Sequence, residues 1–399
     1  MKILYHHRTA SRDGQEVHIT ELVRALRGLG HEVRVVSPGG DEPESGTSEM
    51  GGHRAGLARW RALLPDRLLP LAAFCYDQVF SRQVVRKAAK LQADVLYERH
   101  ALRNRVGVRA ARRLGIPLLL EVNAPLAREE AAFGRVRRLE VELERELETL
   151  RSADAVLVVT GVLKRILADD GLPEERIHVI PNGVAPDRFL TPADLRVREE
   201  LGLMQRLVLG FVGFPRPWHG LERVVQVLAA ADSGPLSDAV LLIAGEGPAL
   251  EPLLRQAREA GLTDRVIVRG VLSREEVPAF IDSFDIALQP HATAYASPLK
   301  LFEYLARGVA VIAPKQPNLE EVLVHGQSAL LFDPALPEAF AGALVRLAGN
   351  RDLRERIAAG GRRRLLEGGF TWTQNAERVV ELARSLRAAG RPSREGEPR

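Results

Sequence analysis

Residues 297–308 of the chain read SPLKLFEYLARG, and residues 309–313 continue as VAVIA. This order predicts a polar loop, an amphipathic helix and then a buried strand. We expect Ser297 to cap the helix and Pro298 to fit its first turn, while Gly308 closes it in a left-handed conformation. A helix that leads at once into an apolar strand is typical of an α/β fold.

The predicted helix has an apolar face and a charged face. Leu299, Phe302 and Ala306 are three and four positions apart, which predicts a buried stripe. Lys300 and Glu303 lie three positions apart near the start of the helix. A cation and a carboxylate beside a helix N-terminus suit a ligand that carries both phosphate and sugar hydroxyls. A capped surface helix with one ion pair has the same spacing, so the spacing alone leaves both interpretations open.

Length and composition predict a globular protein of two domains. The chain has 399 residues, of which 46% are hydrophobic and 27% charged. Its longest uninterrupted apolar run, residues 68–76, is far shorter than the roughly 20 residues of a membrane-spanning helix. Residues 1–5 enter strand-like sequence at once and lack the apolar region of a signal peptide, which predicts a cytoplasmic protein. The single cysteine, Cys75, cannot form an internal disulfide and is expected in the core.

The charge pattern narrows the range of partners. The formal net charge is +4, and no basic run is interleaved with stacking aromatic residues, so we do not expect a nucleic-acid partner. Residues 54–91 combine apolar and arginine side chains at helical spacing. We interpret them as a helix packed on its own sheet. The alternative is peripheral contact with the inner face of a membrane, or with a lipid-linked acceptor.

Two series of alternating strands and helices predict an α/β protein with two doubly wound parallel sheets. The first series has apolar strands at residues 3–5, 32–36, 94–97, 117–122, 155–160 and 177–180. The second series has them at residues 207–212, 240–244, 266–269, 285–289, 309–313 and 329–332. A long charged helix is expected over residues 128–151. The predicted domains are residues 1–191 and 192–371, and residues 391–399 are expected to form a disordered tail.

Two glycine-rich loops follow strands of the second series, at residues 213–220 and 245–248. Neither loop matches the Gly-x-Gly-x-x-Gly dinucleotide fingerprint, and no Walker lysine pattern occurs in the chain. Taken singly, each loop is typical of a tight turn between a strand and a helix.

Taken together and in order, these segments resemble the family-4 retaining glycosyltransferases of the GT-B fold. The resemblance covers nearly the whole chain and rests on PNGV at 181–184, VG at 212–213, GEGP at 245–248, GVL at 270–272, PLKLFEY at 298–304, NLEE at 318–321, HG at 325–326, LLF at 330–332 and FTW at 370–372. It implies two Rossmann-like domains that face a cleft, the first on the acceptor side. It also implies a C-terminal helix at about residues 372–390 that crosses back to the first domain, and a nucleotide-sugar co-substrate with no metal and no other cofactor.

The resemblance implies roles for individual residues. Glu303 would hydrogen-bond the donor ribose, and backbone groups near Val271 and Leu272 would meet the base. Arg216 and Lys300 would meet the diphosphate, whose developing charge such enzymes offset with cations and helix N-termini. The other donor-binding positions that the resemblance implies are Gly14, which would approach the diphosphate from the first domain, and Gly213, His219, Gly245, Ser297, Pro298 and Leu299.

Four positions depart from the family pattern. Tyr295 replaces the first glutamate of the usual Glu-x7-Glu pair, so backbone amides of residues 296–299 are the expected substitutes for binding sugar hydroxyls. The usual Gly-Arg…Lys-Gly clamp reads Gly-Phe214…His219-Gly, and Arg216 is expected to restore one charge. Asn123 replaces the usual donor-sugar histidine and can form a hydrogen bond but cannot carry a proton.

The expected activity is transfer of a sugar from a UDP- or GDP-sugar to a hydroxyl acceptor, with Asn123, Lys300 and Arg216 as the catalytic residues. The leaving phosphate would help to take the acceptor proton, so no enzyme nucleophile is required. The acceptor would be a sugar, a polysaccharide or a lipid-linked intermediate, with His100 and Tyr295 on the acceptor side, although a single histidine is more often structural. The alternative is a catalytically inactive, nucleotide-sugar-binding partner of another glycosyltransferase.

Overall fold

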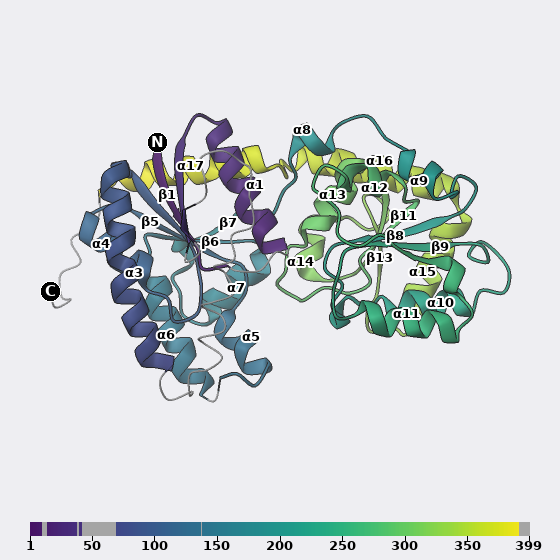
Figure 1. Cartoon of the computed structure of the whole chain (residues 1–399), viewed down its shortest axis with the longest axis horizontal. Coiled ribbons are helices and arrows are strands. Elements are labelled where there is room, and N and C mark those ends of the chain that lie inside the picture. Colours follow the sequence, from purple (N-terminus) through teal and green to yellow (C-terminus); the bar gives the residue numbers. More distant parts are fainter. Residues whose placement is uncertain (10–13, 38–39, 42–68, 137, 391–399) are drawn as a thin grey trace. The chain divides into compact units, whose positions relative to one another are not determined.

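A computed structural model describes residues 1–9, 14–37, 40–41, 69–136 and 138–390. The chain divides into two compact units (Figure 1). Unit 1 contains Met1–Ile180 together with Asn375–Arg399, and unit 2 contains Pro181–Gln374. The limits at residues 191 and 371, as ends of independently folding domains, stay a prediction. The predicted tail, residues 391–399, lies outside the described residues.

Unit 1 is built on a sheet with the strand order β3-β2-β1-β4-β5-β6-β7. Its strands are β1 (Lys2–His6), β2 (Glu32–Ser37), β3 (Gly40–Asp41), β4 (Val95–Arg99), β5 (Leu118–Val122), β6 (Ala155–Val158) and β7 (Ile177–Val179). All neighbouring pairs are parallel except β2 and β3, which are antiparallel. The six predicted strands are confirmed, whereas the sequence analysis did not predict the two-residue strand β3.

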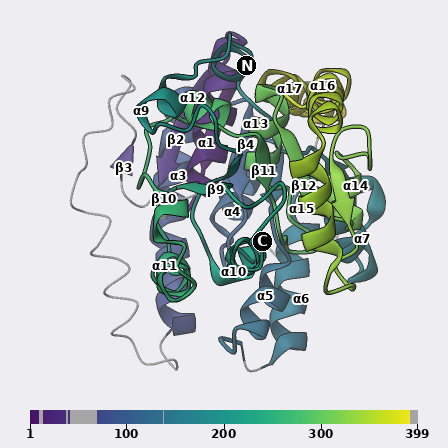
Figure 2. The same ribbon diagram turned by 90° about the vertical axis from the view of Figure 1, so that its right-hand side faces the viewer.

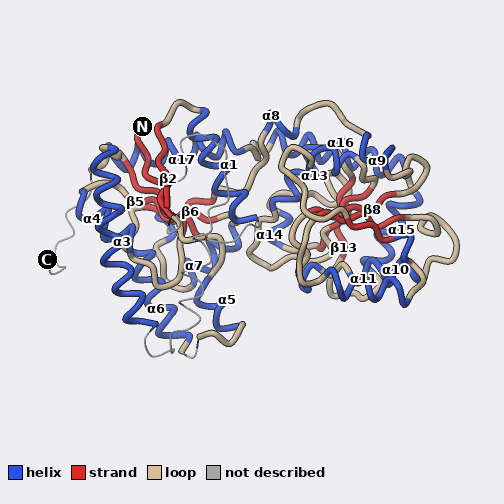
Figure 3. The backbone as a smooth tube through the Cα atoms, viewed as in Figure 1, coloured by secondary structure: helices blue, strands red, loops and turns tan. Residues whose placement is uncertain are grey.

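Helices surround this sheet (Figure 3). They are α1 (Gly14–Gly28), α3 (Leu69–Leu91), α4 (Val106–Leu114), α5 (Leu126–Ala132), α6 (Leu139–Arg151), α7 (Gly161–Asp169) and most of the C-terminal helix α17 (Trp372–Ala388). The prediction of one helix over residues 128–151 is wrong, because α5 ends before Gly134, which adopts a left-handed φ of 70°. Over the residues that the structure describes, every helix is too short or too polar to cross a lipid bilayer.

Unit 2 contains a fully parallel sheet with the strand order β10-β9-β8-β11-β12-β13. Its strands are β8 (Val208–Val212), β9 (Val240–Ala244), β10 (Val266–Val268), β11 (Ile286–Leu288), β12 (Ala310–Pro314) and β13 (Leu330–Phe332). Its helices are α8 (Pro186–Phe189), α9 (Arg196–Glu200), α10 (Glu222–Ala229), α11 (Leu250–Glu259), α12 (Val277–Asp282), α13 (Leu299–Arg307), α14 (Pro317–Glu320), α15 (Ala339–Gly349) and α16 (Arg351–Glu367) (Figures 1 and 2). The six strands predicted for this half are confirmed.

Both faces of the unit 2 sheet are buried. Val240 and Leu242 of β9 pack with α12 and α13 in one apolar cluster, whereas Leu241 and Ile243 pack with α10, α11 and α15 in another. Successive side chains of a strand point to opposite faces, so a strand covered on both faces must be apolar throughout. The continuous apolar runs in the sequence have this cause, and the doubly wound α/β fold is confirmed.

Helix α13 differs in detail from the prediction. Gly308 closes it with a left-handed φ of 64°, as predicted. The N-cap is Pro298, and Ser297 does not cap the helix; its hydroxyl instead accepts a hydrogen bond from the backbone N–H of Asn182 at 3.3 Å. Phe302 and Ala306 are buried as expected, but Leu299 is partly exposed. The first turn of α13 is therefore at the surface of unit 2, where it can meet a ligand.

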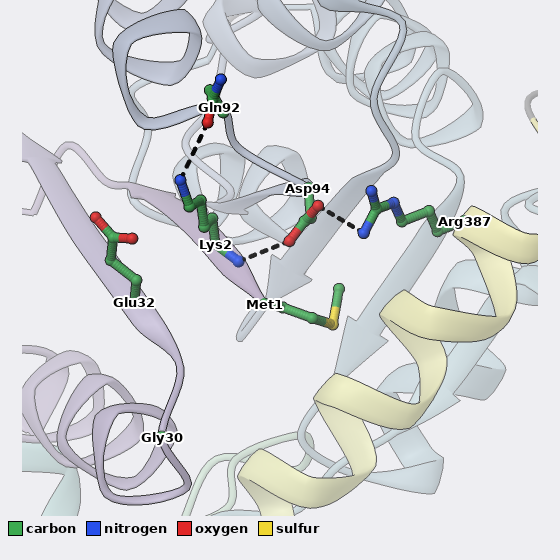
Figure 4. Close-up of a pocket in the computed structure, with 7 residues that line it drawn as sticks. All are labelled: Met1, Lys2, Gly30, Glu32, Gln92, Asp94 and Arg387. Atoms are coloured by element: carbon green, nitrogen blue, oxygen red, sulfur yellow. Dashed lines mark hydrogen bonds and ion pairs between the residues drawn. The ribbon is translucent and has the colours of Figure 1, made fainter.

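A shallow pocket lies at the amino-terminal edge of the unit 1 sheet (Figure 4). Asp94 is its central group: one carboxylate oxygen accepts a hydrogen bond from the backbone N–H of Lys2 at 2.8 Å, and the other lies 2.5 Å from the guanidinium of Arg387. Ligands of parallel sheets bind at the opposite, carboxyl-terminal edge. We therefore interpret the contacts of Asp94 in this pocket as structural, because they attach α17 to the sheet.

We expect Asp94→Ala to lower the free energy of unfolding by about 1–2 kcal/mol, because it removes the partner of the Lys2 amide and of Arg387. Urea denaturation measures this change. Glu32→Ala is the matched control, since Glu32 lines the same pocket with an exposed side chain and should change stability by less than about 0.5 kcal/mol. Equal stabilities of the Asp94 and Glu32 variants would contradict this interpretation.

Candidate active site

Two glycine loops of unit 2 pack directly on each other where β8 and β9 end. The Gly213 N–H donates to the Ala244 carbonyl at 3.0 Å, and the Gly245 N–H donates to the Gly270 carbonyl at 2.5 Å. Gly245 has a φ of 128°, and a Cβ atom there would lie 1.8 Å from the Gly213 carbonyl oxygen. Glycine is required because this position has neither an allowed conformation nor space for a side chain.

We expect Gly245→Ala to destabilise the protein by about 2–4 kcal/mol, because backbone strain and overpacking each cost about 1–3 kcal/mol. Gly270→Ala is the matched control: its φ is 69°, but a Cβ atom there would meet nothing within 4 Å. It should cost only the left-handed strain, about 1–2 kcal/mol. Chemical denaturation measures the free energy of unfolding of both variants. Equal losses would contradict the close approach of the two loops.

Lys300 lies in the first turn of α13 and points toward these loops. Its Nζ atom is 3.9 Å from the centroid of the Phe211 ring, and a Cβ atom at Gly213 would lie 3.6 Å from the same nitrogen. Burial lowers the pKa of Lys300 to about 7, and the carboxylate of Glu303 offsets only part of this effect. A lysine in this state gains a full charge when an anion binds beside it.

The loop after β8 adds Arg216 and His219 to the same region. The His219 Nδ1 atom accepts a hydrogen bond from the Arg216 backbone N–H at 3.0 Å, so the ring proton lies on Nε2. Burial, and then the charges of Lys300 and Arg216, lower the pKa of His219 to about 2. His219 is therefore a neutral hydrogen-bond donor. The structure brings Gly213, Arg216, His219 and Lys300 together, as the resemblance implied.

The loop between β11 and α13 is held by buried amide side chains. The side-chain amide of Asn318 donates to the carbonyls of Thr293 at 3.1 Å and Ala296 at 2.7 Å. The side chain of Asn182 donates to the Ser297 carbonyl at 2.6 Å. These bonds fix the backbone just before α13, where unpaired helical N–H groups and the helix dipole favour an anion. The sequence analysis missed both asparagines as site residues.

The other predicted residues of unit 2 lie on α13 and on the loops that follow β10 and β11. Glu303 is partly buried one turn beyond Lys300 on α13. Val271 is 69% exposed and follows Gly270, whereas Leu272 packs partly against the apolar core. Tyr295, which is predicted on the acceptor side, is partly buried in the loop before α13. The contacts of these residues with a donor or an acceptor stay predictions.

Among the described residues of unit 1, three buried histidine–glutamate pairs lie at or near the carboxyl ends of its strands. His6 lies 2.5 Å from Glu98, His18 lies 3.0 Å from Glu121, and His100 lies 3.0 Å from Glu146. All six side chains are less than a tenth exposed. The predicted acceptor-side residue His100 is thus a buried partner of a carboxylate. The sequence analysis did not identify any of the three glutamates.

Glu121 is the centre of the largest of these networks. Its carboxylate accepts hydrogen bonds from the Tyr97 hydroxyl at 2.7 Å, from Arg99 and from the side-chain amide of Asn123, and it pairs with His18. Burial alone would raise the pKa of Glu121, but His18 and Arg99, together with these hydrogen bonds, hold that pKa well below its usual range. The hydrogen bond to Glu121 fixes the orientation of the Asn123 side chain. The predicted role of Asn123 in catalysis stays a prediction.

Gly14 is exposed at the start of α1, where residues 10–13 lie outside the described residues. The acceptor is expected along the loops at residues 8–16 and 39–53 and along residues 54–86, and residues 10–13, 39 and 42–68 of these stretches also lie outside the described residues. These predictions are not tested by the structure.

Family models match both parts of the chain. Residues 12–188 match Glycosyltransferase Family 4, and residues 196–364 match Glycosyl transferases group 1. The chain is 33% identical over 189 residues to the 2-deoxystreptamine glucosyltransferase of Streptomyces kanamyceticus. This alignment covers 45% of this chain and 48% of that protein. It is 27% identical to the MMP alpha-(1->4)-mannosyltransferase of Mycolicibacterium hassiacum, over 92% of this chain and 94% of that protein.

Solved structures show the same fold. HepE of Anabaena in complex with UDP has a TM-score of 0.75 at 19% identity, over 97% of this chain and 100% of that one. Sucrose-phosphate synthase from Thermosynechococcus elongatus also has a TM-score of 0.75, at 20% identity, over 98% of this chain and 100% of that one. With both halves matched, the chain belongs to glycosyltransferase family 4 and is a nucleotide-sugar glycosyltransferase of the hexosyltransferase type with the GT-B fold.

Proposed function

We propose that this protein is a retaining α-glycosyltransferase that moves a sugar from a UDP- or GDP-sugar to a hydroxyl acceptor without a metal ion. The observation that carries the proposal is the cluster of Lys300, Arg216 and His219 beside the start of α13. Two cationic side chains and one neutral donor converge at the carboxyl ends of parallel strands, the usual ligand position in such sheets. This arrangement suits a diphosphate better than it suits a neutral ligand.

The reaction breaks the bond between the anomeric carbon and the diphosphate oxygen. The acceptor hydroxyl attacks from the face that the diphosphate leaves, and its proton passes to the leaving phosphate. The negative charge on the departing nucleoside diphosphate is offset by Lys300, Arg216 and the N-terminus of α13. No enzyme nucleophile takes part, and configuration at the anomeric carbon is retained.

The remaining roles follow from position and from the relatives. Glu303 binds the donor ribose, and the backbone at Val271 and Leu272 meets the base. UDP and UDP-glucose are bound in structures of HepE, and relatives from mycobacteria are named as GDP-mannose-dependent mannosyltransferases. Both kinds of base are therefore included in the proposal. In unit 1 we assign Gly14 to donor binding, Asn123 to catalysis and His100 to the acceptor side, with Tyr295 of unit 2.

The acceptor belongs to polysaccharide, glycoconjugate or glycolipid synthesis, and the enzyme acts in the cytoplasm. Peripheral membrane contact through residues 54–91 remains part of the proposal, although residues 54–68 lie outside the described residues. The second candidate, a catalytically inactive nucleotide-sugar-binding partner of another glycosyltransferase, is favoured by Tyr295 and Asn123, which replace the usual glutamate and histidine.

A thermal-shift panel of UDP, GDP, ADP and TDP, each with its common sugar conjugates and with or without EDTA, tests the donor site. A ligand that binds only the folded state raises the melting temperature, and the increase grows with the ratio of its concentration to its dissociation constant. We expect one nucleotide family to raise it, equally with and without EDTA. Product NMR with that donor then gives the anomeric configuration. Donor binding with neither transfer nor slow donor hydrolysis would support the inactive partner instead.

We expect Glu303→Ala to weaken binding of the selected nucleotide sugar by about 10- to 100-fold, because a charged hydrogen bond to the ribose is lost. Glu259→Ala, on the exposed face of α11, removes an equal charge away from the site and should leave the dissociation constant unchanged. Isothermal titration calorimetry compares the two variants. An unchanged dissociation constant in the Glu303 variant would remove Glu303 from the site.

A further inference from the structure

Two large aromatic side chains are exposed in the loop that carries Arg216. Phe214 is 41% exposed and Trp218 is 40% exposed, one on each side of Arg216 in the sequence. Both rings contact the side chain of Arg216, which lies between them in the sequence.

Arg216 lies against both rings. Its guanidinium carbon is 4.8 Å from the centroid of the Phe214 ring and 5.0 Å from that of the Trp218 ring. Both distances are within the range of a favourable cation–π contact, and a planar, weakly hydrated guanidinium is well suited to such contacts. Two ring contacts restrict the rotamers of a side chain that is otherwise very flexible.

The backbone beneath Arg216 is also fixed. Its N–H donates to His219 Nδ1 at 3.0 Å, and its carbonyl accepts from the His219 N–H at 2.9 Å. Pro217 begins the short 3-10 helix Pro217–His219, and Gly220 ends it with a left-handed φ of 71°. Arg216 is therefore held in two places: hydrogen bonds with His219 fix its backbone, and the two rings contact its guanidinium.

We propose that Phe214 and Trp218 are positioning residues, which hold the guanidinium of Arg216 ready for the diphosphate of the donor. This inference rests on the proposed function. Its neighbour His219 is neutral, so the loop depends on the guanidinium of Arg216 for a charge that faces the diphosphate. Holding the side chain in advance removes the entropic cost of ordering it when the donor binds.

The alternative is that the two rings stack directly on the sugar or the base of the donor. A double-mutant cycle separates the two cases, because positioning residues act only through the residue that they position. The variants are Phe214→Leu, Trp218→Leu and Arg216→Gln, with each ring variant also combined with Arg216→Gln. Titration calorimetry with the nucleotide sugar chosen by the melting panel gives the dissociation constants.

We expect each leucine variant to weaken donor binding about two- to five-fold, and to have no further effect when Arg216 is already glutamine. Trp218→Phe and Phe214→Tyr keep a ring and should restore wild-type binding. Leu366→Ala removes another exposed apolar side chain, on α16, and should change nothing. Melting temperatures identify any variant that fails to fold.

An equal loss in the Arg216→Gln background would overturn the inference in favour of direct stacking. No loss in either leucine variant would overturn it as well. Failure of the proposed function gives a different result, since Arg216→Gln alone would then leave donor binding unchanged.

Discussion

Replacing Lys300 by methionine should weaken binding of the nucleotide sugar about 100-fold and lower the transfer rate at least as much. Methionine fills a similar volume beside Phe211 but cannot meet the diphosphate with a charge. Loss of one preorganised donor to a developing negative charge typically costs about 100- to 1000-fold. Lys90→Met, at an exposed position in the last turn of α3, is the matched control and should leave donor binding unchanged.

The same lysine predicts how donor binding depends on pH. Burial lowers the pKa of Lys300 to about 7 in the free protein, so above that pH the donor must bind together with a proton. The dissociation constant should therefore rise by roughly tenfold per pH unit above about 7, until the pH reaches the pKa of Lys300 in the complex. Lys300→Arg keeps its charge and should abolish this slope. A flat profile in the wild-type protein would contradict the assignment of Lys300.

Replacing Glu121 by alanine should lower the free energy of unfolding by about 3–5 kcal/mol, because buried Arg99 and His18 lose their anionic partner. Urea denaturation measures the loss. Glu144→Ala is the matched control, since Glu144 is 59% exposed in its pair with Arg151 and should cost less than about 1 kcal/mol. Similar losses in the two variants would show that the network around Glu121 is not a stabilising one.

Glu121 also predicts the response of stability to acid. Its pKa in the folded protein lies below its ordinary value, so its contribution is present above the pKa of an unfolded glutamate and is lost as the pH falls below it. Glu121→Gln removes this titration. The wild-type protein should therefore lose stability more steeply than the glutamine variant between about pH 5 and 3. If the stabilities of the two proteins fell equally steeply with pH, the charge of Glu121 would not be stabilised in the folded protein.

The strands and the helix α13 could be predicted from the sequence because burial on both faces leaves continuous apolar runs. The break between α5 and α6 could not, because Gly134 interrupts a charged pattern that continues on both sides of it. The N-terminal cap of α13 was also predicted wrongly. A serine next to a proline satisfies the local rule, but Ser297 instead forms a hydrogen bond with Asn182, which is distant in the sequence.

The candidate site divides in the same way. Arg216 and His219 could be found because they lie in the glycine-rich loop 213–220, and Lys300 because it lies in the segment 298–304 that carries the resemblance. Glu121 and Glu98 were missed, although each is a carboxylate at the end of an apolar strand, which is a signal in itself. Their histidine partners come from elements that are more than 90 positions away, so no local pattern pairs them.

The central claim is that a nucleotide-sugar diphosphate binds between Lys300 and Arg216 at the start of α13. A crystal structure with the nucleoside diphosphate that the melting panel selects tests it most directly. We predict phosphate oxygens within hydrogen-bonding distance of Lys300 Nζ, the Arg216 guanidinium and the first N–H groups of α13. Phosphates bound elsewhere, for example in the pocket around Asp94 and Arg387, would contradict the claim.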